Sequence, residues 1–531
     1  MSRPGLGPAW VWLAAALMAL PFLMAGGRPP ISTLPNQLAA LAAGGAVLMM
    51  FHAKPARRPW ALHQALLGGL ALAGLVSSVM VIQPLLWGAV NEAPARAMGA
   101  LRQPNHLASL LVWAAGSLVA LQVHQRWKPP LAWLGMALLM TALVLTGSRT
   151  GLLGVGLLIL WGLVDHRLPR ASRQILCATP VMVMLAWWML PQLATVEGSA
   201  LQAPQRLLSL SGDVSSLRLA IWRDALSLIS SHPGSGVGWG QFNLAWSLTP
   251  MAQRPPELFD HTHNLVLQLM VELGIPLGLL LSLALAGLML WALRRAWKAE
   301  GEGAVLQRCC AGLLWVMALH SLLEYPLWYA HFLVPTVMAL CLVFSEPNRE
   351  NAAAHLTAVS TNIAARTGAQ IAGLALGAAM LLAAGAAYVD YQSVSDIYAP
   401  SAGAKSLQQR MARGQQSWLF SRYADYAVAT NQAAEPQQPW PPNLAHAFAG
   451  ASHLLLDPKL MKAWAQAYAA RNGPQDLDRA RYLAARLREF KTPGAQAWFE
   501  ECARPRTAGA NAAFQCEAPV GNWSWRDFVG P

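Results

Sequence analysis

Long runs of apolar residues, separated by short polar segments, recur along most of the chain. A run of about 20 apolar residues is long enough to cross a bilayer as a helix. Such runs occupy residues 9–25, 35–51, 62–82, 106–123, 131–147, 150–164, 174–190, 264–292, 304–321, 331–345 and 371–389. The pattern therefore predicts an all-α, polytopic membrane protein of about eleven transmembrane helices. The number is approximate because only the short turn TGSRTG separates the runs at 131–147 and 150–164.

A long polar loop interrupts this pattern at 191–262. It contains the segment VSSLRLAIWRDALSLISSHP, one helical face of which carries Leu217, Ile221, Ala225 and Leu228. This spacing predicts an amphipathic helix that lies at the membrane surface. The next segment, HPGSGVGWGQF, lacks the Gly-Lys-Ser/Thr of a phosphate loop, so we expect a flexible turn there.

The C-terminal stretch, at 391–531, is richer in charged residues, Gln and Pro than the rest of the chain. Its Ala-rich segments LMKAWAQAYAAR and LDRARYLAARLREF predict a small domain of paired helices, similar to a tetratricopeptide-type hairpin. We therefore expect two domains. Residues 1–390 form the transmembrane domain, which includes the loop at 191–262, and residues 391–531 form a C-terminal helical domain.

Composition and charge agree with a membrane protein. Hydrophobic residues make up 55% of the chain and charged residues 12%, which is too few charges for a soluble protein of this length. The formal net charge of +13 reflects basic loops between the apolar runs, so it does not indicate nucleic-acid binding. Alternate loops, which the positive-inside rule assigns to the cytoplasm, carry Lys54, Arg57, Arg58, Arg126, Lys128, Arg167, Arg170, Arg173, Arg294, Arg295, Lys298, Arg349 and Arg366.

This alternation places the N-terminus in the cytoplasm and both the 191–262 loop and the C-terminal stretch outside. The cations of the exterior loops are all arginines: Arg28, Arg96, Arg102, Arg149, Arg206, Arg218, Arg223 and Arg254. A guanidinium can hold a phosphate with two hydrogen bonds, although chance in an arginine-rich chain would give the same excess. Arg149 stands in a tight turn between two apolar runs, where a charge is costly unless it is paired or functional. Arg218 and Arg223 are five positions apart, so they cannot both face one ligand from a regular helix.

The segment Asp260-His261-Thr262-His263-Asn264 leads into the apolar run at 264–292. Thr262 or Asn264 can cap the helix, which places His263 beside the helix N-terminus. That end of a helix attracts anions such as phosphate and disfavours imidazolium. The sequence therefore predicts a neutral histidine base beside an anion site at a membrane surface. The alternative is an interfacial histidine that only caps a helix.

Five local patterns together resemble one family. They are QPNHLA at 103–108, GSRTG at 147–151, SLRLAIWRDAL followed by HPGSGVGWGQF, HTHNLVLQLMVELGIPLG at 261–278, and EYPLWYAHFL at 324–333. In this order they look like the O-antigen ligase and polysaccharide polymerase superfamily of bacterial inner membranes. The EYPLWY block and the helical C-terminal stretch resemble the branch of PglL-type protein O-oligosaccharyltransferases.

The resemblance implies a reaction without metal, nucleotide or other cofactor. An oligosaccharide moves from undecaprenyl pyrophosphate to a Ser or Thr hydroxyl of a periplasmic protein such as pilin. Such a reaction needs a base for the acceptor hydroxyl, fixed cations for the pyrophosphate, and a groove open to the membrane lipid. O-antigen ligase, with a lipid acceptor, and O-antigen polymerase are the alternatives with the same chemistry. A transporter of lipid-linked substrates is the alternative from another class, but the arginines lie at one face of the membrane.

The resemblance also assigns roles to residues of this sequence. His263 matches the family's His-Asn histidine and is the expected base, and His261 is expected to orient the acceptor. Arg218 matches the family's loop arginine, and with Arg149 it is expected to bind the pyrophosphate. Asn264 is expected to bind substrate. Asp260, His261 and His263 are metal-ligand types, but no further Cys, His or Asp cluster supports a metal site.

Another group of residues is expected to bind substrate. Gln103 and Asn105 match the family's Gln-x-Asn block and bind sugar or phosphate, or else cap a helix. Arg102 stands where a small residue is typical of the family. Tyr325 and Tyr329 stack on sugar or bind the acceptor, or else belong to an interfacial aromatic belt. Glu324 is expected to pair with an arginine of the site.

The six cysteines fall into two groups. Four of them, Cys177, Cys309, Cys310 and Cys341, lie in apolar runs and are expected to act as small hydrophobic residues. Cys502 and Cys516 lie in the exterior C-terminal stretch, in the oxidising periplasm, and we expect them to form a disulfide there.

Overall fold

The computed structural model describes residues 9–53, 60–87, 96–125, 127–193, 214–251, 253–255, 257–345, 359–432, 442–471, 473–503 and 513–528. Among these residues the chain is all helical, and no strand occurs. Several residues of the predicted basic and exterior loops lie outside the described residues: Lys54, Arg57, Arg58, Arg126, Arg206 and Arg349. The chain divides into two compact units.

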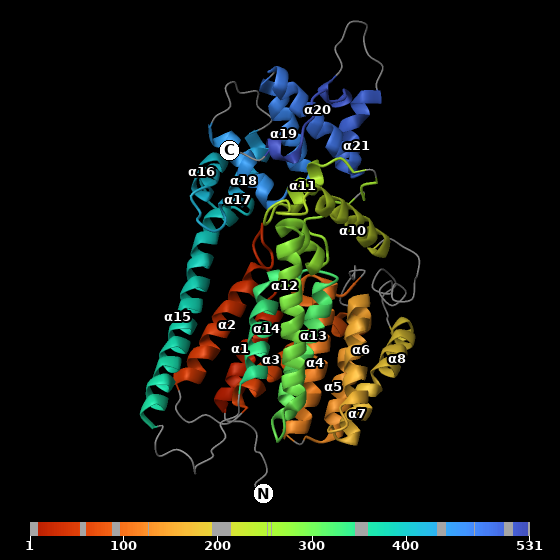
Figure 1. The fold of residues 1–531 in the computed structure, drawn as a ribbon, viewed down its shortest axis with the longest axis vertical. Helices are drawn as coiled ribbons and strands as arrows, with labels where there is room; N and C mark the ends of the chain where they lie inside the picture. Colours follow the sequence, from red (N-terminus) through yellow and green to blue (C-terminus); the bar gives the residue numbers. More distant parts are fainter. Residues whose placement is uncertain are drawn as a thin grey trace. The chain divides into compact units, whose positions relative to one another are not determined.

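The first unit comprises Met1–Gly27, Ile31–Ser211 and Leu285–Ala386. Its helices are α1 (Ala9–Leu23), α2 (Leu34–Ala53), α3 (Ala61–Trp87), α4 (Pro104–Gln125), α5 (Pro129–Thr146), α6 (Arg149–Val164), α7 (Arg170–Cys177), α8 (Thr179–Leu193), α13 (Ala304–Ser321) and α14 (Ala330–Phe344), with parts of α12 (Leu265–Lys298) and α15 (Val359–Tyr398) (Figure 1). Short 3₁₀ helices, η1 (Gly99–Leu101) and η3 (Pro326–Trp328), precede α4 and α14.

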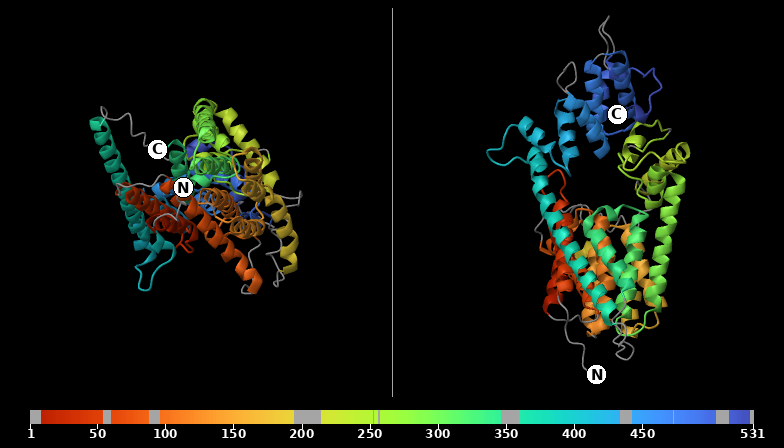
Figure 2. Two further views of the ribbon diagram at one scale, coloured as in Figure 1. Left: turned by 90° about the horizontal axis from the view of Figure 1, so that it is seen from below. Right: turned by 60° about the vertical axis from the view of Figure 1, so that its left-hand side comes forward.

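Helix α4 lies at the centre of this unit. It packs against α3, α5, α6 and α13, and nearly all of its residues are buried. Figure 2 shows the helices of this unit from two further directions. Trp113 of α4 is 1% exposed and donates its indole N–H to the carbonyl oxygen of Leu313 in α13 at 3.0 Å. Because α4 is apolar on every side, it is suited to a helix enclosed by other helices.

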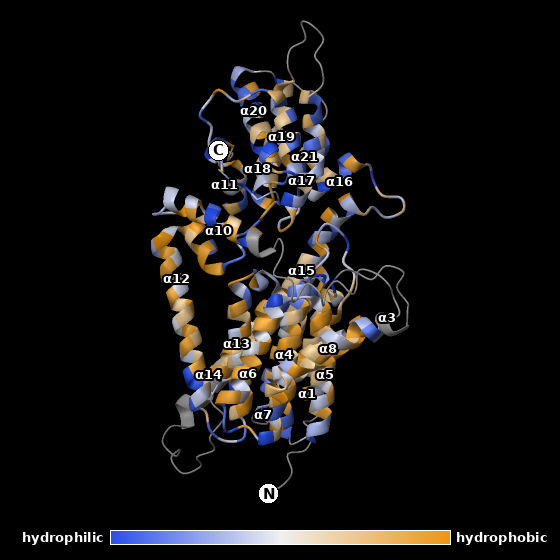
Figure 3. Cartoon of the chain, turned by 90° about the vertical axis from the view of Figure 1, so that its right-hand side faces the viewer, coloured by the Kyte–Doolittle hydropathy of each residue, from blue (hydrophilic) through white to orange (hydrophobic). Residues whose placement is uncertain are grey.

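The helices occur at all eleven places where the sequence predicts an apolar span. In the described part of the chain, seven are long and apolar enough to cross a membrane, and α7 with α8, bent by 42°, makes an eighth. Three further apolar helices, α1, α6 and α14, are shorter. Figure 3 shows the apolar character of these segments. The chain is therefore a multi-pass membrane protein, and the predicted number of eleven spans stays a prediction.

The second unit comprises Arg28–Pro30, Gly212–Ala284 and Ala387–Pro531. Its helices are α10 (Val214–Ser231), α11 (Phe242–Leu248), the first part of α12, the end of α15, α16 (Leu407–Gly414), α17 (Ser421–Gln432), α18 (Pro442–Leu454), α19 (Pro458–Arg471), α20 (Pro474–Glu489) and α21 (Pro493–Phe499), followed by η4 (Glu500–Ala503), η5 (Phe514–Cys516) and η6 (Trp525–Phe528). The two Ala-rich segments form α19 and α20, which pack together as predicted, and α17 packs against α18 as a second pair.

The boundaries of these units differ from those expected from the sequence. The break at 386–387 lies close to the expected one at 390–391, but residues 212–284 group with the C-terminal helices. Asn243 shows why, because its side chain accepts a hydrogen bond from the Leu456 amide at 2.7 Å and donates to the Phe259 carbonyl at 2.9 Å. Arg254 likewise contacts Glu489 of α20 at 2.8 Å and stacks over Trp246.

The amphipathic helix α10 corrects a prediction. The face with Ile221, Ala225 and Leu228, which the sequence analysis assigned to the membrane surface, is at most 2% exposed and belongs to the hydrophobic core of the second unit. An apolar stripe of this kind can be covered by lipid or by protein. Here Trp246 of α11 and helices of the C-terminal stretch belong to the same core and provide the cover.

Candidate functional site

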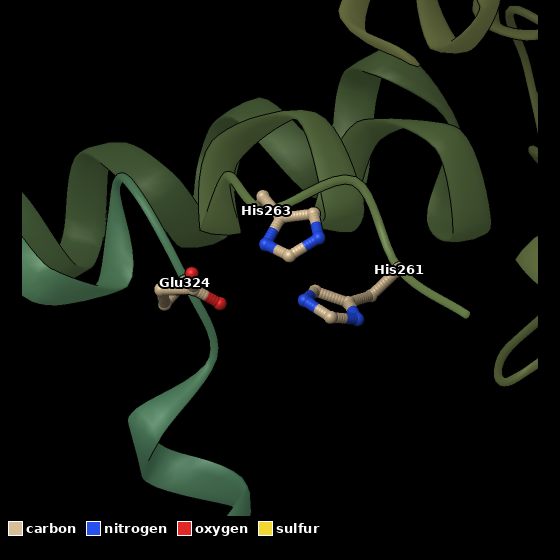
Figure 4. A group of neighbouring side chains, drawn as sticks. All are labelled: His261, His263 and Glu324. Carbon is tan, nitrogen blue, oxygen red and sulfur yellow. The ribbon is translucent and has the colours of Figure 1, made fainter. Parts of the chain in front are cut away.

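The two histidines of the predicted site lie in a short turn before α12. Their rings are tilted against each other, with centroids 4.0 Å apart (Figure 4). His263 has a left-handed backbone, with φ of 55°, and its ring meets Phe259 edge-on at 5.4 Å. A positive φ is uncommon for a residue with a side chain and costs about 1 kcal/mol or more, so the surrounding contacts must hold this turn.

Asp260 orients the first histidine. Its carboxylate accepts a hydrogen bond from Nδ1–H of His261, which leaves the lone pair of that imidazole on Nε2. Burial would raise the pKa of Asp260, but the hydrogen bond from His261 and the electrostatic interaction with that imidazole hold this pKa below its ordinary value. Asp260 is therefore ionised at neutral pH. Sequence reasoning named Asp260 only as a metal-ligand type and missed this pairing, for which its place next to His261 was the available signal.

The residues on either side of His263 fix the start of α12. The side-chain oxygen of Asn264 accepts hydrogen bonds from the amides of Val266 and Leu267, at 3.0 and 3.2 Å. Asn264 is thus the N-cap that the sequence predicted as one of two candidates. Because this oxygen is engaged, only the amide nitrogen of Asn264 is left for the predicted substrate binding.

A chain of buried hydrogen bonds supports the same turn from within the second unit. The amide of Thr262 donates to the side-chain oxygen of Gln268 at 2.8 Å, and the Gln268 amide group donates to Glu272 at 2.9 Å. The Thr262 carbonyl accepts the indole N–H of Trp222 in α10 at 2.9 Å. Buried polar groups of this kind fix one conformation when every member has a partner. Of these residues the sequence singles out only Thr262, as a candidate helix cap, and the supporting roles of Gln268, Glu272 and Trp222 were not predicted.

The glycine-rich segment at 232–240 is also part of this support, which corrects the expectation of a flexible turn. Helix α12 is broken at Gly274, whose φ is 81°. At the break, the amides of Val237 and Gly238 donate to the carbonyls of Val271 and Glu272, at 2.9 and 3.0 Å. A Cβ at Gly274 would lie 2.2 Å from the carbonyl oxygen of Gly234, so the approach requires glycine. The segment thereby holds the first part of α12.

The two arginines of α10 differ in their surroundings. Arg223 donates to the side-chain oxygen of Gln253 at 2.8 Å and to Asp224 at 3.3 Å, so it anchors the loop at 253. Arg218 is half buried and lies four residues before Trp222, on the same face of α10. Since Trp222 contacts the turn with the histidines, this face of α10 is directed to that turn. This supports Arg218, and not Arg223, as the candidate ligand.

The first unit contains a separate polar network, centred on Asn105. Its side-chain oxygen accepts hydrogen bonds from Ser148 at 2.7 Å and from Arg96 at 3.3 Å, and its amide group donates to Glu324 at 3.0 Å. Arg96 also donates to the carbonyl of Thr146 at 2.8 Å. The structure thus brings together Asn105 and Glu324, which were predicted, and adds Arg96, which was predicted only as an exterior cation.

Other predicted residues flank this network. Ser148 caps α6 by accepting from the amide of Gly151 at 3.1 Å, and Arg149 is the first residue of that helix. Gln103 accepts from the amide of His106 at 2.6 Å, so its side-chain oxygen caps α4, the second of the two roles expected for it.

The predicted tyrosines flank η3. Their rings lie 5.9 Å apart, and the ring of Tyr329 meets buried His106 edge-on at 4.7 Å. Tyr325 packs on Trp328, which is 51% exposed. An exposed tryptophan beside tyrosines is compatible with sugar stacking and with an interfacial aromatic belt, the two roles that the sequence left open.

Cys502 and Cys516 are bonded to each other in the structure, with Cα atoms 5.4 Å apart. The four cysteines of the apolar helices, Cys177, Cys309, Cys310 and Cys341, are free thiols. The imidazoles of His261 and His263 are ligand types that a metal could use. The absence of a metal from the reaction therefore stays a prediction.

Two parts of the chain match models of known protein families. Residues 134–282 match the O-antigen ligase family model, and residues 309–491 match the model of the C-terminal part of a virulence factor membrane-bound polymerase. The chain is 27% identical over 286 residues to a general O-oligosaccharyltransferase of Acinetobacter baylyi, a match covering 51% of this chain and 49% of that protein.

Two further relatives are similar. A ComP-specific O-oligosaccharyltransferase of the same organism is 31% identical over 137 residues, which are 26% of this chain and 24% of that protein. An O-antigen ligase of Pseudomonas aeruginosa is 27% identical over 249 residues, 44% and 52% of the two chains. The matches thus span about half the length of two relatives and a quarter of the third. They confirm the resemblance to the O-antigen ligase superfamily and its O-oligosaccharyltransferases.

Proposed function

We propose that this membrane protein, a relative of O-antigen ligases and O-oligosaccharyltransferases, transfers an oligosaccharide from undecaprenyl pyrophosphate to Ser or Thr hydroxyls of periplasmic proteins such as pilins. The observation that carries the proposal is the turn before α12, where His261 and His263 lie ring to ring beside the capped start of a helix. The proposed setting is the bacterial inner membrane, with this turn on the periplasmic side, as the distribution of basic residues indicates.

In the proposed reaction, His263 removes the proton of the acceptor hydroxyl as its oxygen attacks the anomeric carbon of the sugar. His263 is more exposed than His261, which is 3% exposed, so it is the imidazole that an acceptor reaches more easily. Asp260 and His261 then have a positioning role, because their hydrogen bond holds the ring of His261 against the ring of His263. No metal or other cofactor takes part.

The bond between the anomeric carbon and the pyrophosphate breaks in the same step, and its electron pair leaves with undecaprenyl pyrophosphate. Arg218 and Arg149 are the proposed cations that stabilise this leaving group, through the bidentate geometry of guanidinium. For Arg218 the support is the face of α10 that it shares with Trp222. For Arg149 it is a position at the first turn of α6, where backbone N–H groups also favour an anion.

O-antigen ligase is the second candidate function, because the match at 134–282 and one similar protein carry that description. The two functions share the donor and differ in the acceptor. Polymerase activity would use a second lipid-linked oligosaccharide as acceptor, and a transporter of lipid-linked substrates would move the donor without consuming it.

One experiment separates these candidates. The purified protein is incubated with a lipid-linked oligosaccharide in three parallel reactions, which contain a pilin-like protein, lipid A-core or no acceptor. Each reaction is run with and without excess chelator. We expect glycan on Ser or Thr of the protein acceptor, with chelator present as well as absent. Glycan on lipid A-core alone, lengthened glycan without acceptor, or intact donor in every reaction would each reject the proposed protein transfer.

A further inference from the structure

A cavity of about 630 Å³ lies among α6, α12 and α13 of the first unit. Its walls are mostly apolar and include Leu160 and Trp161 of α6 and Gly312 and Trp315 of α13. Three basic residues also line it, Arg294 and Lys298 of α12 and Arg308 of α13. A cavity of this size is within the range of pockets that bind small ligands, about 300–1,000 Å³.

The basic and apolar parts of the cavity are separated along the helices. Arg294 and Lys298 are one turn apart in the last turns of α12, and Arg308 lies in the second turn of α13. From Arg308, Trp315 is seven residues further into α13, a rise of about 10 Å. The cavity therefore has a cationic end near the helix termini and an apolar part that extends into the helical span.

The cationic end keeps a net positive charge. The lining includes no acidic residue, and the carboxylate of Asp165 contacts Arg308 of the lining at 2.6 Å. The same carboxylate contacts Arg167 at 3.2 Å, so one acid serves two arginines. Arg294 and Lys298 are exposed and add two further charges. A ligand with an anionic group is favoured at this end.

Trp315 contributes a hydrogen-bond donor to the apolar part. Its indole nitrogen is buried and makes no hydrogen bond to any residue that the structure describes. A buried donor without a partner is costly, and a ligand that brings an acceptor to this depth would satisfy it. A ligand that fits this cavity therefore has an anionic head group, a hydrogen-bond acceptor below it and an apolar tail.

We propose that this cavity binds an anionic phospholipid of the bilayer. Its phosphate contacts Arg294 and Lys298, an ester carbonyl accepts the Trp315 indole N–H, and an acyl chain fills the space beside Gly312. Basic pockets between transmembrane helices on the cytoplasmic side are suited to anionic head groups. Arg295 of α12, together with Arg170 and Arg173 of α7, which follows α6 in the chain, identifies this end as cytoplasmic by the positive-inside rule.

This lipid site is separate from the Asn105 network within the same unit. Arg149 begins α6, whereas Leu160 and Trp161 lie three turns later, about 16–18 Å along the helix. Arg308 lies in the second turn of α13, whereas Glu324 follows the opposite end of that helix. The inference therefore does not depend on the proposed glycosyl transfer, and its failure would leave that proposal unchanged.

The test measures lipid binding to the full-length protein in detergent, by native mass spectrometry and by thermal unfolding with added lipid. We expect phosphatidylglycerol to remain bound and to raise the unfolding temperature, and phosphatidylcholine to do so much less. The double substitution Arg294→Gln with Lys298→Gln should weaken phosphatidylglycerol binding about tenfold or more. The matched control, Arg170→Gln in α7 with Arg295→Gln in α12, removes two charges that the same rule assigns to the cytoplasmic side but that do not line the cavity, and it should bind like the wild type.

A second pair of variants tests the apolar part. A Cβ at Gly312 would meet nothing within 4 Å, and leucine is a better helix former than glycine, so Gly312→Leu should fold and fill the cavity. The same holds for Gly156 of α6, which does not line the cavity and provides the control Gly156→Leu. We expect Gly312→Leu to lose bound phosphatidylglycerol and Gly156→Leu to retain it. Equal binding of both lipids, or wild-type binding by both Gly312→Leu and the double charge variant, would overturn the proposal.

Discussion

Trp222 donates its indole N–H to the carbonyl oxygen of Thr262 at 2.9 Å and so ties α10 to the turn with the two histidines. Arg218 lies one turn before Trp222 on the same face of α10. This hydrogen bond therefore links the helix that carries Arg218 to the turn that carries His261 and His263, more than 40 residues later in the chain. If this contact positions the proposed leaving-group ligand, its loss should affect transfer more than folding.

We therefore expect Trp222→Phe to lower the rate of oligosaccharide transfer by roughly tenfold, because phenylalanine keeps the aromatic packing but removes the donor. The measurement is the initial rate with saturating donor, at equal amounts of folded protein. Trp239→Phe is the matched control, since Trp239 is 68% exposed. Equal rates in the two variants would show that the contact does not matter for transfer.

Gly274→Ala should destabilise the protein by about 2–3 kcal/mol or more. The left-handed φ of 81° disfavours alanine, and the new methyl group would collide with the backbone of Gly234. Thermal unfolding in detergent should show a lower midpoint, together with loss of transfer. Gly287→Ala, at a position in α12 where a Cβ meets nothing, should leave the midpoint unchanged or raise it. Similar midpoints for the two variants would contradict the packing described for the break in α12.

The sequence predicts the positions of all eleven apolar helices because a run of about 20 apolar residues is a local property. It also predicts that His263 lies beside the start of a helix that Asn264 can cap, because both features follow from neighbouring residues. It misses Gln268 and Trp222 as supports of the turn, because their roles depend on partners that folding brings together. The environment of α10 and the rigidity of the 232–240 segment were predicted wrongly for the same reason. The residues that cover Ile221 and the backbone that approaches Gly274 lie elsewhere in the chain.

Asp260 should give the folded protein a dependence on acid pH. Its pKa in the folded state lies below the ordinary value of 3.8, so its ionisation stabilises the folded state above that pH. This contribution is lost as the pH falls from 3.8 through the lower, folded pKa. Asp260→Asn should therefore unfold at a lower temperature than the wild type at pH 5–7, and the difference should shrink below pH 4. A difference that is constant or grows toward acid would contradict the ionised pair with His261.

Cys502→Ser should loosen the C-terminal helices without removing a catalytic group. The bond closes a loop with a sequence separation of 14 residues, for which the chain-entropy model gives about 3 kcal/mol. We expect a lower unfolding midpoint and faster proteolysis near the C-terminus, with part of the transfer activity retained. Cys341→Ser, at an exposed free thiol, is the control. Alkylation of both Cys502 and Cys516 in protein isolated without reductant would show that the bond does not form in the cell.

We propose that His263 is the base of glycosyl transfer, and the decisive measurement is single-turnover transfer by its alanine variant. Purified His263→Ala is mixed with a lipid-linked oligosaccharide and an acceptor protein, beside wild type and His166→Ala, which changes an exposed histidine after α6. Monodisperse elution and an unfolding midpoint close to that of the wild type establish that each variant is folded. We predict that His263→Ala binds donor but forms no glycoprotein above background, whereas His166→Ala matches the wild type. Transfer by folded His263→Ala at a near wild-type rate would show that His263 is not the base.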